Sequence, residues 1–187
     1  MNWESLPTIT ADRVTLRPIA ERDIGSLFEI FSDPEVMRYW SSTPLKDMEA
    51  ARALLADIHD KFHRRLYLQW GIARRVDDTL IGTSTLFHIE SNNYRAEIGY
   101  ALGRAHWGKG FVNEALTALL GYAFDELNLR RVEADVDPRN ERSIRTLERL
   151  GFQKEGYLRE RWEVGGEVQD ALFYGLLRRD WDGAKAV

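Results

Sequence analysis

The stretch 103–111, with the sequence GRAHWGKGF, is the part of the chain whose residue types most directly indicate chemistry. Gly108 and Gly110 flank Lys109 and directly precede an apolar segment with helical spacing. Glycine lets the backbone come close to a ligand because no Cβ intervenes. The N–H groups and the dipole at a helix N-terminus favour an anion. The stretch therefore predicts an anion-binding loop with a phosphate group as its occupant.

A nucleotide hydrolase is the first alternative, because the same stretch nearly matches the phosphate loop G-x-x-x-x-G-K-[ST]. Gly110 stands where that loop has a Ser or Thr whose hydroxyl binds Mg²⁺, and glycine has no hydroxyl. Such enzymes also continue after the loop as alternating strands and helices around a parallel sheet. Too little chain follows here, and three meander-like strands precede the loop. The pattern favours a phosphate that is bound without metal and is not hydrolysed.

The helices and strands predicted around this loop indicate an α+β fold with a mixed central sheet. Alternation with a period of two predicts about seven strands, at 13–19, 67–76, 79–89, 96–102, 130–137, 154–165 and 168–177. Apolar residues at helical spacing predict about four flanking helices, at 23–31, 46–65, 111–127 and 140–150. Pro34 is expected to end the first helix, and Gly151 the last.

The composition describes an ordinary globular chain of 187 residues, with 44% hydrophobic and 30% charged residues. This length corresponds to one domain, predicted to span 1–187. The chain has no cysteine, and its net charge of −4 is spread along the sequence, which predicts no nucleic-acid partner. There is no apolar run long enough for a membrane span and no signal-like N-terminus, so we expect a cytoplasmic protein that does not bind membranes.

The segment from Ala96 to Gly156 resembles the GNAT superfamily of acyl-CoA-dependent N-acyltransferases, and within it the RimJ/RimL-like branch. The matching residues are EIGYAL, HWGKGFVNEAL and NERSIRTLERLGFQKEG. The opening ADRVTLRPIAERD and the ending DALFYGLLRRDW extend the resemblance to nearly the whole chain. The superfamily loop is usually [QR]-x-x-G-x-G/A. Ala105 occupies its first position and Arg104 lies one residue early, so no side-chain role is carried over to Arg104.

The resemblance implies a single GNAT-like domain in which the fourth and fifth predicted strands splay apart. It also implies that acetyl-CoA is the co-substrate, with its pyrophosphate in the loop and its pantetheine arm in the splay, and that no metal is needed. The residues expected to bind it through the splayed strand are Ile98, Gly99, Tyr100, Ala101 and Leu102. Those expected in the loop and the following turn are Trp107, Gly108, Lys109, Gly110, Phe111 and Val112.

Acetyl transfer from a thioester to a primary amine needs a neutral amine, a polarised carbonyl, a stabilised oxyanion and protonation of the leaving thiolate. The chain offers no cysteine nucleophile and no G-x-S-x-G elbow. Direct attack of the amine in a ternary complex is therefore favoured over a covalent acyl-enzyme.

Glu97 is the candidate general base. Strand alternation places its side chain on one face with Gly99 and Ala101, a face of small residues that could border the cofactor. An exposed strand carboxylate without a catalytic role is the alternative. Glu160 and Glu163, in the strand predicted at 154–165, are the other candidates for the base, and the sequence does not choose among the three.

Asn140 and Ser143 open the helix predicted at 140–150. Asn is a common N-cap and Ser is ordinary in a first turn, so a structural role explains both. By resemblance, Asn140 also binds the pantetheine arm, and Ser143 binds there too and is a candidate proton donor to the sulfur. Tyr39 and Trp40 lie between the first two predicted helices, where they either line a slot for the acceptor or belong to the core.

The leading hypothesis is an N-acetyltransferase whose acceptor is a protein N-terminus or a small-molecule amine. A non-catalytic module that senses acyl-CoA is the alternative from a different class. The sequence names neither the acceptor nor the oligomeric state, which could be a monomer or a homodimer.

Overall fold

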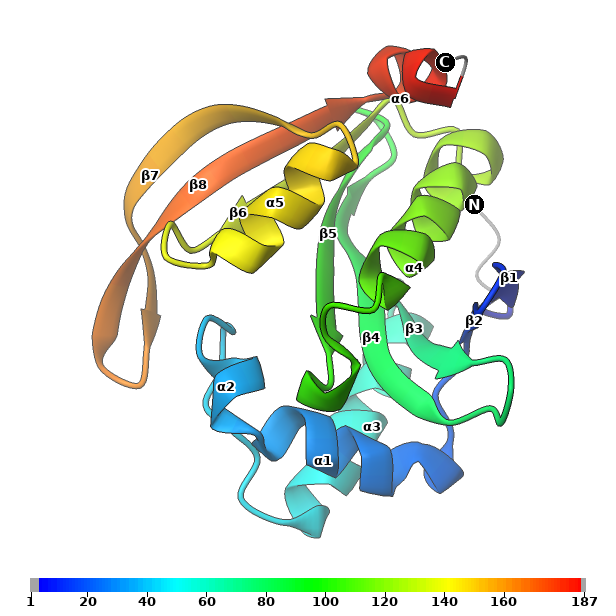
Figure 1. Cartoon of the computed structure of the whole chain (residues 1–187), viewed down its shortest axis with the longest axis vertical. Helices are drawn as coiled ribbons and strands as arrows, with labels where there is room; N and C mark the ends of the chain where they lie inside the picture. Colours follow the sequence, from blue (N-terminus) through cyan, green and yellow to red (C-terminus); the bar gives the residue numbers. More distant parts are fainter. Residues whose placement is uncertain (1–3, 186–187) are drawn as a thin grey trace.

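The central feature is one mixed sheet with the strand order β1-β2-β3-β4-β5-β6-β8-β7, shown in Figure 1. The structure, a computed structural model, describes residues 4–185. The predicted domain range 1–187 also includes residues 1–3 and 186–187, which lie outside the described residues. The strands are Ile9–Thr10 (β1), Val14–Arg17 (β2), Leu68–Arg74 (β3), Leu80–Glu90 (β4), Arg95–Leu102 (β5), Arg131–Val136 (β6), Gln153–Val164 (β7) and Glu167–Leu177 (β8).

The described residues contain eight strands, one more than the seven predicted. The additional strand, β1, has only two residues, which is too short for alternation to reveal. From β2 to β5 the strands pair antiparallel, which confirms the expected meander. Strand alternation in β5 sends Ile98 and Leu102 into a core cluster with α4, and Ala101 into a second cluster with α1 and α3.

Six α-helices cover this sheet among the described residues, two more than predicted. They are Ile24–Ser32 (α1), Pro34–Met37 (α2), Met48–His63 (α3), Phe111–Gly121 (α4), Glu141–Arg149 (α5) and Arg178–Lys185 (α6). Short 3₁₀ turns precede α1 and follow β5, and a π-helical turn at Tyr122–Glu126 extends α4. The two unpredicted helices are short and lie at a proline and at the C-terminal end.

The prediction that Pro34 ends the first helix was incomplete, because Pro34 also begins α2. The Asp33 side chain accepts a hydrogen bond from the Glu35 amide at 2.9 Å and caps this new helix. Proline suits the first helical position because its missing N–H has no partner there. The helix predicted at 46–65 is Met48–His63, since the Asp47 side chain caps it at the Ala50 amide.

The splay expected between the predicted strands at 96–102 and 130–137 is present between β5 and β6. These two strands are parallel and pair only at Arg95–Arg131, Ala96–Val132 and Glu97–Glu133. Beyond Glu97, β5 continues against β4 alone, while β6 continues against β8. Figure 1 shows the resulting V-shaped separation, with α4 beside β5 and α5 beside β6.

The long hairpin of β7 and β8 forms the outer wall on the β6 side. In Figure 1 it curves away from the sheet and its tip approaches the segment around α2. The contact is direct, since a Cβ placed on Gly165 would lie 3.6 Å from Cγ2 of Thr43. The splay is therefore bounded by β5, by β6 with the hairpin, and by the segment between α2 and α3.

Candidate active site

The predicted anion loop ends in a helix N-terminus without a side-chain cap. Gly110 is the N-cap of α4 with φ of 81°, and Gly108 has φ of 72°. Both values lie in the left-handed region that glycine adopts without strain. Gly108, Lys109 and Gly110 are exposed. The first amides of α4 therefore face an open loop, which is the arrangement that binds a phosphate group.

Basic side chains from three parts of the chain surround this loop. Arg13, from the turn before β2, donates to the Lys109 carbonyl at 3.0 Å and lies 4.9 Å from the Phe111 ring centroid. Arg142, from the first turn of α5, lies 4.5 Å from the Trp107 ring centroid. Lys109 itself donates through Nζ to the Ala105 carbonyl at 2.8 Å. Arg13 also forms an ion pair with Glu114 in the first turn of α4 at 2.8 Å, which offsets part of its charge.

Two contacts fix the shape of the loop. The Trp107 indole donates to the Leu102 carbonyl at 2.7 Å, which ties the loop back to the end of β5. Arg104 forms an ion pair with Asp33 at 2.9 Å, which ties it to the N-cap of α2. Arg104 is thus engaged by a carboxylate of the chain, and the structure assigns it a role in positioning the loop.

The first turn of α5 lies against the open part of β5. The Asn140 side chain accepts a hydrogen bond from the Ser143 amide at 3.1 Å, so Asn140 is the N-cap of α5, as its residue type suggested. The Tyr100 hydroxyl lies 2.7 Å from Ser143 Oγ. Tyr100 lies beyond the last pair of β5 with β6, so this contact spans the splay. The residues predicted to hold the pantetheine arm from two distant segments are brought together.

Glu97 lies at the vertex of the splay, since Glu97–Glu133 is the last pair between β5 and β6. Only 12% of its side chain is exposed. Its Oε1 lies 2.9 Å from Nδ1 of His88, which is more than half exposed. His88 sits at an irregularity of β4 with φ of 47°. The alternative that Glu97 is an ordinary exposed strand carboxylate is wrong, because the side chain is buried.

Glu133, opposite Glu97 on β6, is also buried but has a different environment. It forms ion pairs with Arg95 and Arg131, and Arg131 in turn pairs with Glu155. These bonds satisfy the Glu133 carboxylate within the sheet. Of the two carboxylates at the vertex, Glu97 is the one that contacts a histidine.

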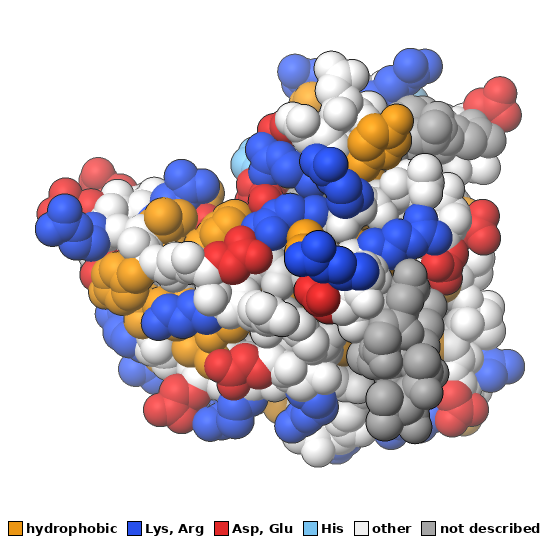
Figure 2. Space-filling view, turned by 90° about the horizontal axis from the view of Figure 1, so that it is seen from above, with side chains coloured by type: hydrophobic (Ala, Val, Ile, Leu, Met, Phe, Trp, Pro, Cys, Tyr) orange, Lys and Arg blue, Asp and Glu red, His pale blue; other side chains and the backbone are white. Residues whose placement is uncertain are grey.

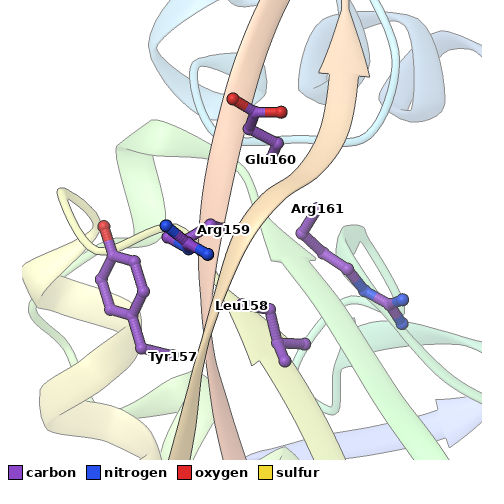
Figure 3. Close-up of a pocket in the computed structure, with 5 residues that line it drawn as sticks. All are labelled: Tyr157, Leu158, Arg159, Glu160 and Arg161. Atoms are coloured by element: carbon purple, nitrogen blue, oxygen red, sulfur yellow. The ribbon is translucent and has the colours of Figure 1, made fainter.

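The alternative base candidates lie on the exposed hairpin. Glu160 and Glu163 are both exposed on β7. Glu160 has φ of 52° and donates its amide to Asp170 at 2.7 Å, at a point where the β7–β8 register shifts. An open hollow lies here, lined by Tyr157, Leu158, Arg159, Glu160 and Arg161. Figure 3 shows the Glu160 carboxylate pointing away from the Tyr157 ring.

The two aromatic residues predicted for the acceptor slot have different surroundings. Trp40 packs edge-on against Phe31, with ring centroids 5.6 Å apart, and contacts the second core cluster. The Tyr39 ring lies 5.3 Å from the Arg38 guanidinium and 5.7 Å from that of Arg139, which precedes α5. Tyr39 thus links the segment after α2 to the β6 side of the splay, whereas Trp40 has a mainly structural environment.

Sequence reasoning missed two side-chain contacts at this site. Only backbone contacts were predicted for Tyr100, although alternation in β5 places it on the face opposite Glu97, where α5 packs. His88 could not be assigned a role from sequence. His88 precedes Glu97 by nine residues and lies on the neighbouring strand β4 of the same hairpin. Because β4 is irregular at this point, alternation does not predict which residues of β4 and β5 lie side by side.

The described residues contain no cluster of three or more metal-ligating side chains and no helix that is both long and apolar enough to cross a membrane. On the face shown in Figure 2, acidic and basic side chains are interspersed. Apolar side chains gather there on the side of the β7–β8 hairpin, which exposes Tyr157, Trp162 and Val168.

A parallel pair of strands that separates beside a glycine-rich loop and a helix N-terminus is the arrangement that the family resemblance implied. A family model described as "Acetyltransferase (GNAT) domain" matches residues 13–153. The chain belongs to the GNAT acetyltransferase family, with RimJ-like relatives.

Curated relatives and solved structures cover nearly the whole chain. An uncharacterised N-acetyltransferase, p20, of Bacillus licheniformis is 41% identical and covers 95% of this chain and 100% of its own. The [ribosomal protein uS5]-alanine N-acetyltransferase of Escherichia coli K12 is 27% identical, with 92% of each chain covered. Mycobacterium smegmatis RimJ in complex with CoA-disulfide has a TM-score of 0.84 at 24% identity, over 93% of this chain and 88% of that one.

Proposed function

We propose that this cytoplasmic protein transfers the acetyl group of acetyl-CoA to a primary amine by direct attack in a ternary complex. The observation that carries the proposal is the end of β5–β6 pairing at Glu97–Glu133. Beyond this pair the open edge of Ile98–Leu102 leads from the uncapped N-terminus of α4 to the buried carboxylate of Glu97. A cofactor arm laid along that edge would join a phosphate site to a proton acceptor.

The residues present fit coenzyme A. The loop offers two exposed glycines with positive φ and the uncapped amides of α4 for a diphosphate. The β5 residues beyond Glu97 and the first turn of α5, with Asn140 and Ser143, offer polar groups on the two sides of the splay for a narrow polar arm. When bound, acetyl-CoA supplies an activated acetyl group. The chain's own residues hold its phosphates, align its thioester and manage the protons.

In this proposal Glu97 accepts the proton from the amine, and Ser143 binds the departing sulfur. Glu97 is buried at the vertex, and His88, which contacts it, reaches solvent. A proton taken from the amine can therefore leave the site through the Glu97–His88 contact. Glu160 and Glu163 are exposed on the β7–β8 hairpin, whereas Glu97 lies at the vertex of the splay.

The acceptor class is the finer part of the proposal. A protein N-terminus is favoured, because an uS5-alanine N-acetyltransferase is among the relatives that align along nearly the whole chain. The splay opens toward α2, Tyr39 and the hairpin tip, where an extended chain could enter. A small-molecule amine remains the alternative acceptor, and Tyr39 with Trp40 are the candidate contacts for either. A monomer or a homodimer would both accommodate this site.

An amine panel with acetyl-CoA tests the function directly. We expect free thiol to appear, measured with a thiol reagent, when peptides with free N-termini are supplied. N-terminally blocked copies of the same peptides, without lysine, are the matched control and should give only background hydrolysis. Binding of acetyl-CoA without turnover of any peptide, amino acid or polyamine would instead indicate the sensor module.

Binding of CoA should not depend on a metal ion. The loop has glycine at the position where a nucleotide hydrolase places its Mg²⁺ ligand, and backbone amides need no bridging cation to bind a diphosphate. Isothermal titration calorimetry with CoA should therefore give the same Kd with and without EDTA. A loss of binding on chelation, restored by Mg²⁺, would contradict this expectation.

A further inference from the structure

The contact between Tyr100 and Ser143 is more than a packing contact across the splay. Tyr100 comes from the stretch of β5 that pairs with β4 alone, and Ser143 from the first turn of α5. Their hydroxyl oxygens are 2.7 Å apart, which is the normal length of an O–H···O bond. The Tyr100 hydroxyl also lies 3.4 Å from the Ser143 carbonyl, a weak contact, and forms a hydrogen bond with the Thr146 side chain one turn further along α5.

The direction of the short bond decides what the Ser143 hydroxyl can do. If Ser143 donated to Tyr100, Tyr100 would donate to Thr146 or to the distant carbonyl, and the proton of Ser143 would not reach the sulfur. If Tyr100 donates to Ser143 Oγ, the proton of Tyr100 lies in the short bond. The hydroxyl proton of Ser143 can then point toward another acceptor. Burial raises the pKa of the Tyr100 hydroxyl to about 12, so Tyr100 keeps its proton at physiological pH.

We propose that Tyr100 is a positioning residue that donates a hydrogen bond to Ser143 and thereby directs the proton of Ser143 at the departing sulfur of acetyl-CoA. The inference rests on the proposed function and adds a side-chain role to a residue expected to act through its backbone. Consecutive hydrogen bonds polarise one another, so the bond from Tyr100 makes Ser143 a better donor.

The transfer step balances with these residues. The amine nitrogen forms a bond to the acetyl carbon, and the bond between that carbon and sulfur breaks with its electron pair going to sulfur. Ser143 stabilises the sulfur anion through its O–H, while Tyr100 supports Ser143 and stays protonated. The amine nitrogen loses one proton and the sulfur finally gains one from solvent, so the neutral amine and thioester give an amide and a thiol.

A double-mutant cycle with Tyr100→Phe and Ser143→Ala tests the inference. Tyr100→Phe removes a single hydroxyl, and we expect kcat to fall by about 3- to 10-fold, the size of one net hydrogen bond. The KM for acetyl-CoA should change less than twofold. In a Ser143→Ala background Tyr100→Phe should have no further effect, because Tyr100 acts through Ser143.

A second measurement does not depend on turnover. The ultraviolet absorbance of the thiolate reports the pKa of the CoA thiol when CoA is bound. A hydrogen bond from Ser143 lowers that pKa, so both Tyr100→Phe and Ser143→Ala should raise it. The double variant should raise the pKa of the CoA thiol no more than Ser143→Ala alone does.

Tyr174→Phe is the matched control. Tyr174 also reaches from a strand to α5, where its buried hydroxyl donates to Glu148 at 3.2 Å, but it contacts the other end of the helix. This variant should leave kcat and the thiol pKa unchanged, although thermal unfolding reports any loss of stability in all variants. A change of kcat and of the CoA thiol pKa in Tyr100→Phe, but not in Tyr174→Phe, supports the positioning role.

Two outcomes would overturn it. Tyr100→Phe could match the wild type in kcat and thiol pKa, or its effect could persist in full when Ser143 is Ala. Either result leaves the proposed function standing if the wild type still acetylates the peptide panel. A wild type that turns over no amine would overturn both the proposed function and this inference.

Discussion

Gly110→Val is expected to weaken CoA binding by about 10- to 100-fold, whereas Lys109→Ala weakens it by no more than about fivefold. A β-branched residue at φ of 81° costs about 1–3 kcal/mol, and its Cβ would lie 3.2 Å from Nη2 of Arg13, which contacts the loop. Lys109 contributes one exposed charge, worth about 1 kcal/mol or less. Titration calorimetry with CoA measures both variants directly.

Backbone strain alone must be separated from loss of the phosphate site. Gly166, in the β7–β8 turn, has φ of 85° and open space around it, so Gly166→Val introduces comparable strain far from the loop. It should leave the Kd for CoA unchanged, and thermal unfolding should show whether either protein has lost its fold. An equal or larger effect of Lys109→Ala would mean that charge, and not close backbone approach, holds the diphosphate.

The loop was predictable from sequence because its chemistry depends on local residue types. Glycines flanking Lys109 before an apolar helical pattern indicate an uncapped helix N-terminus, and the structure places Gly110 at that N-cap. The splay itself is not visible in residue patterns, since strands 96–102 and 130–137 alternate in the same way whether they are paired or not. Its expectation came from the family resemblance, and the limited pairing of β5 with β6 confirms it.

Contacts between distant segments were not predictable. The Arg104–Asp33 ion pair and the Tyr100–Ser143 bond each join elements whose relative placement depends on the packed sheet. Alternation also could not say that the Glu97 side chain is buried, because burial depends on residues that are distant in sequence. Periodicity predicts which side chains of a strand lie on the same face, but not which residues cover that face.

Glu97→Gln is expected to lower kcat/KM by at least about 100-fold near pH 7, since general-base assistance contributes about 10²–10⁴-fold. The amide keeps the size of the side chain and an acceptor for His88, but it cannot take a proton. Activity should recover partly as the pH rises, because a growing fraction of the amine is then already neutral. The Kd for CoA should change little, since Glu97 and the loop lie at opposite ends of the open stretch of β5.

Glu133→Gln is the control that isolates the proton from the buried charge. Glu133 lies opposite Glu97 and is also buried, but its carboxylate is paired with Arg95 and Arg131. This variant should unfold at a lower temperature than the wild type. The ratio of its activity to that of the wild type should not rise with pH. If Glu97→Gln retained near-full activity at pH 7, the base would lie elsewhere, with Glu160 and Glu163 to be tested next. An α-amine acceptor with a pKa near 8 could then also react without a base, because part of it is neutral at that pH.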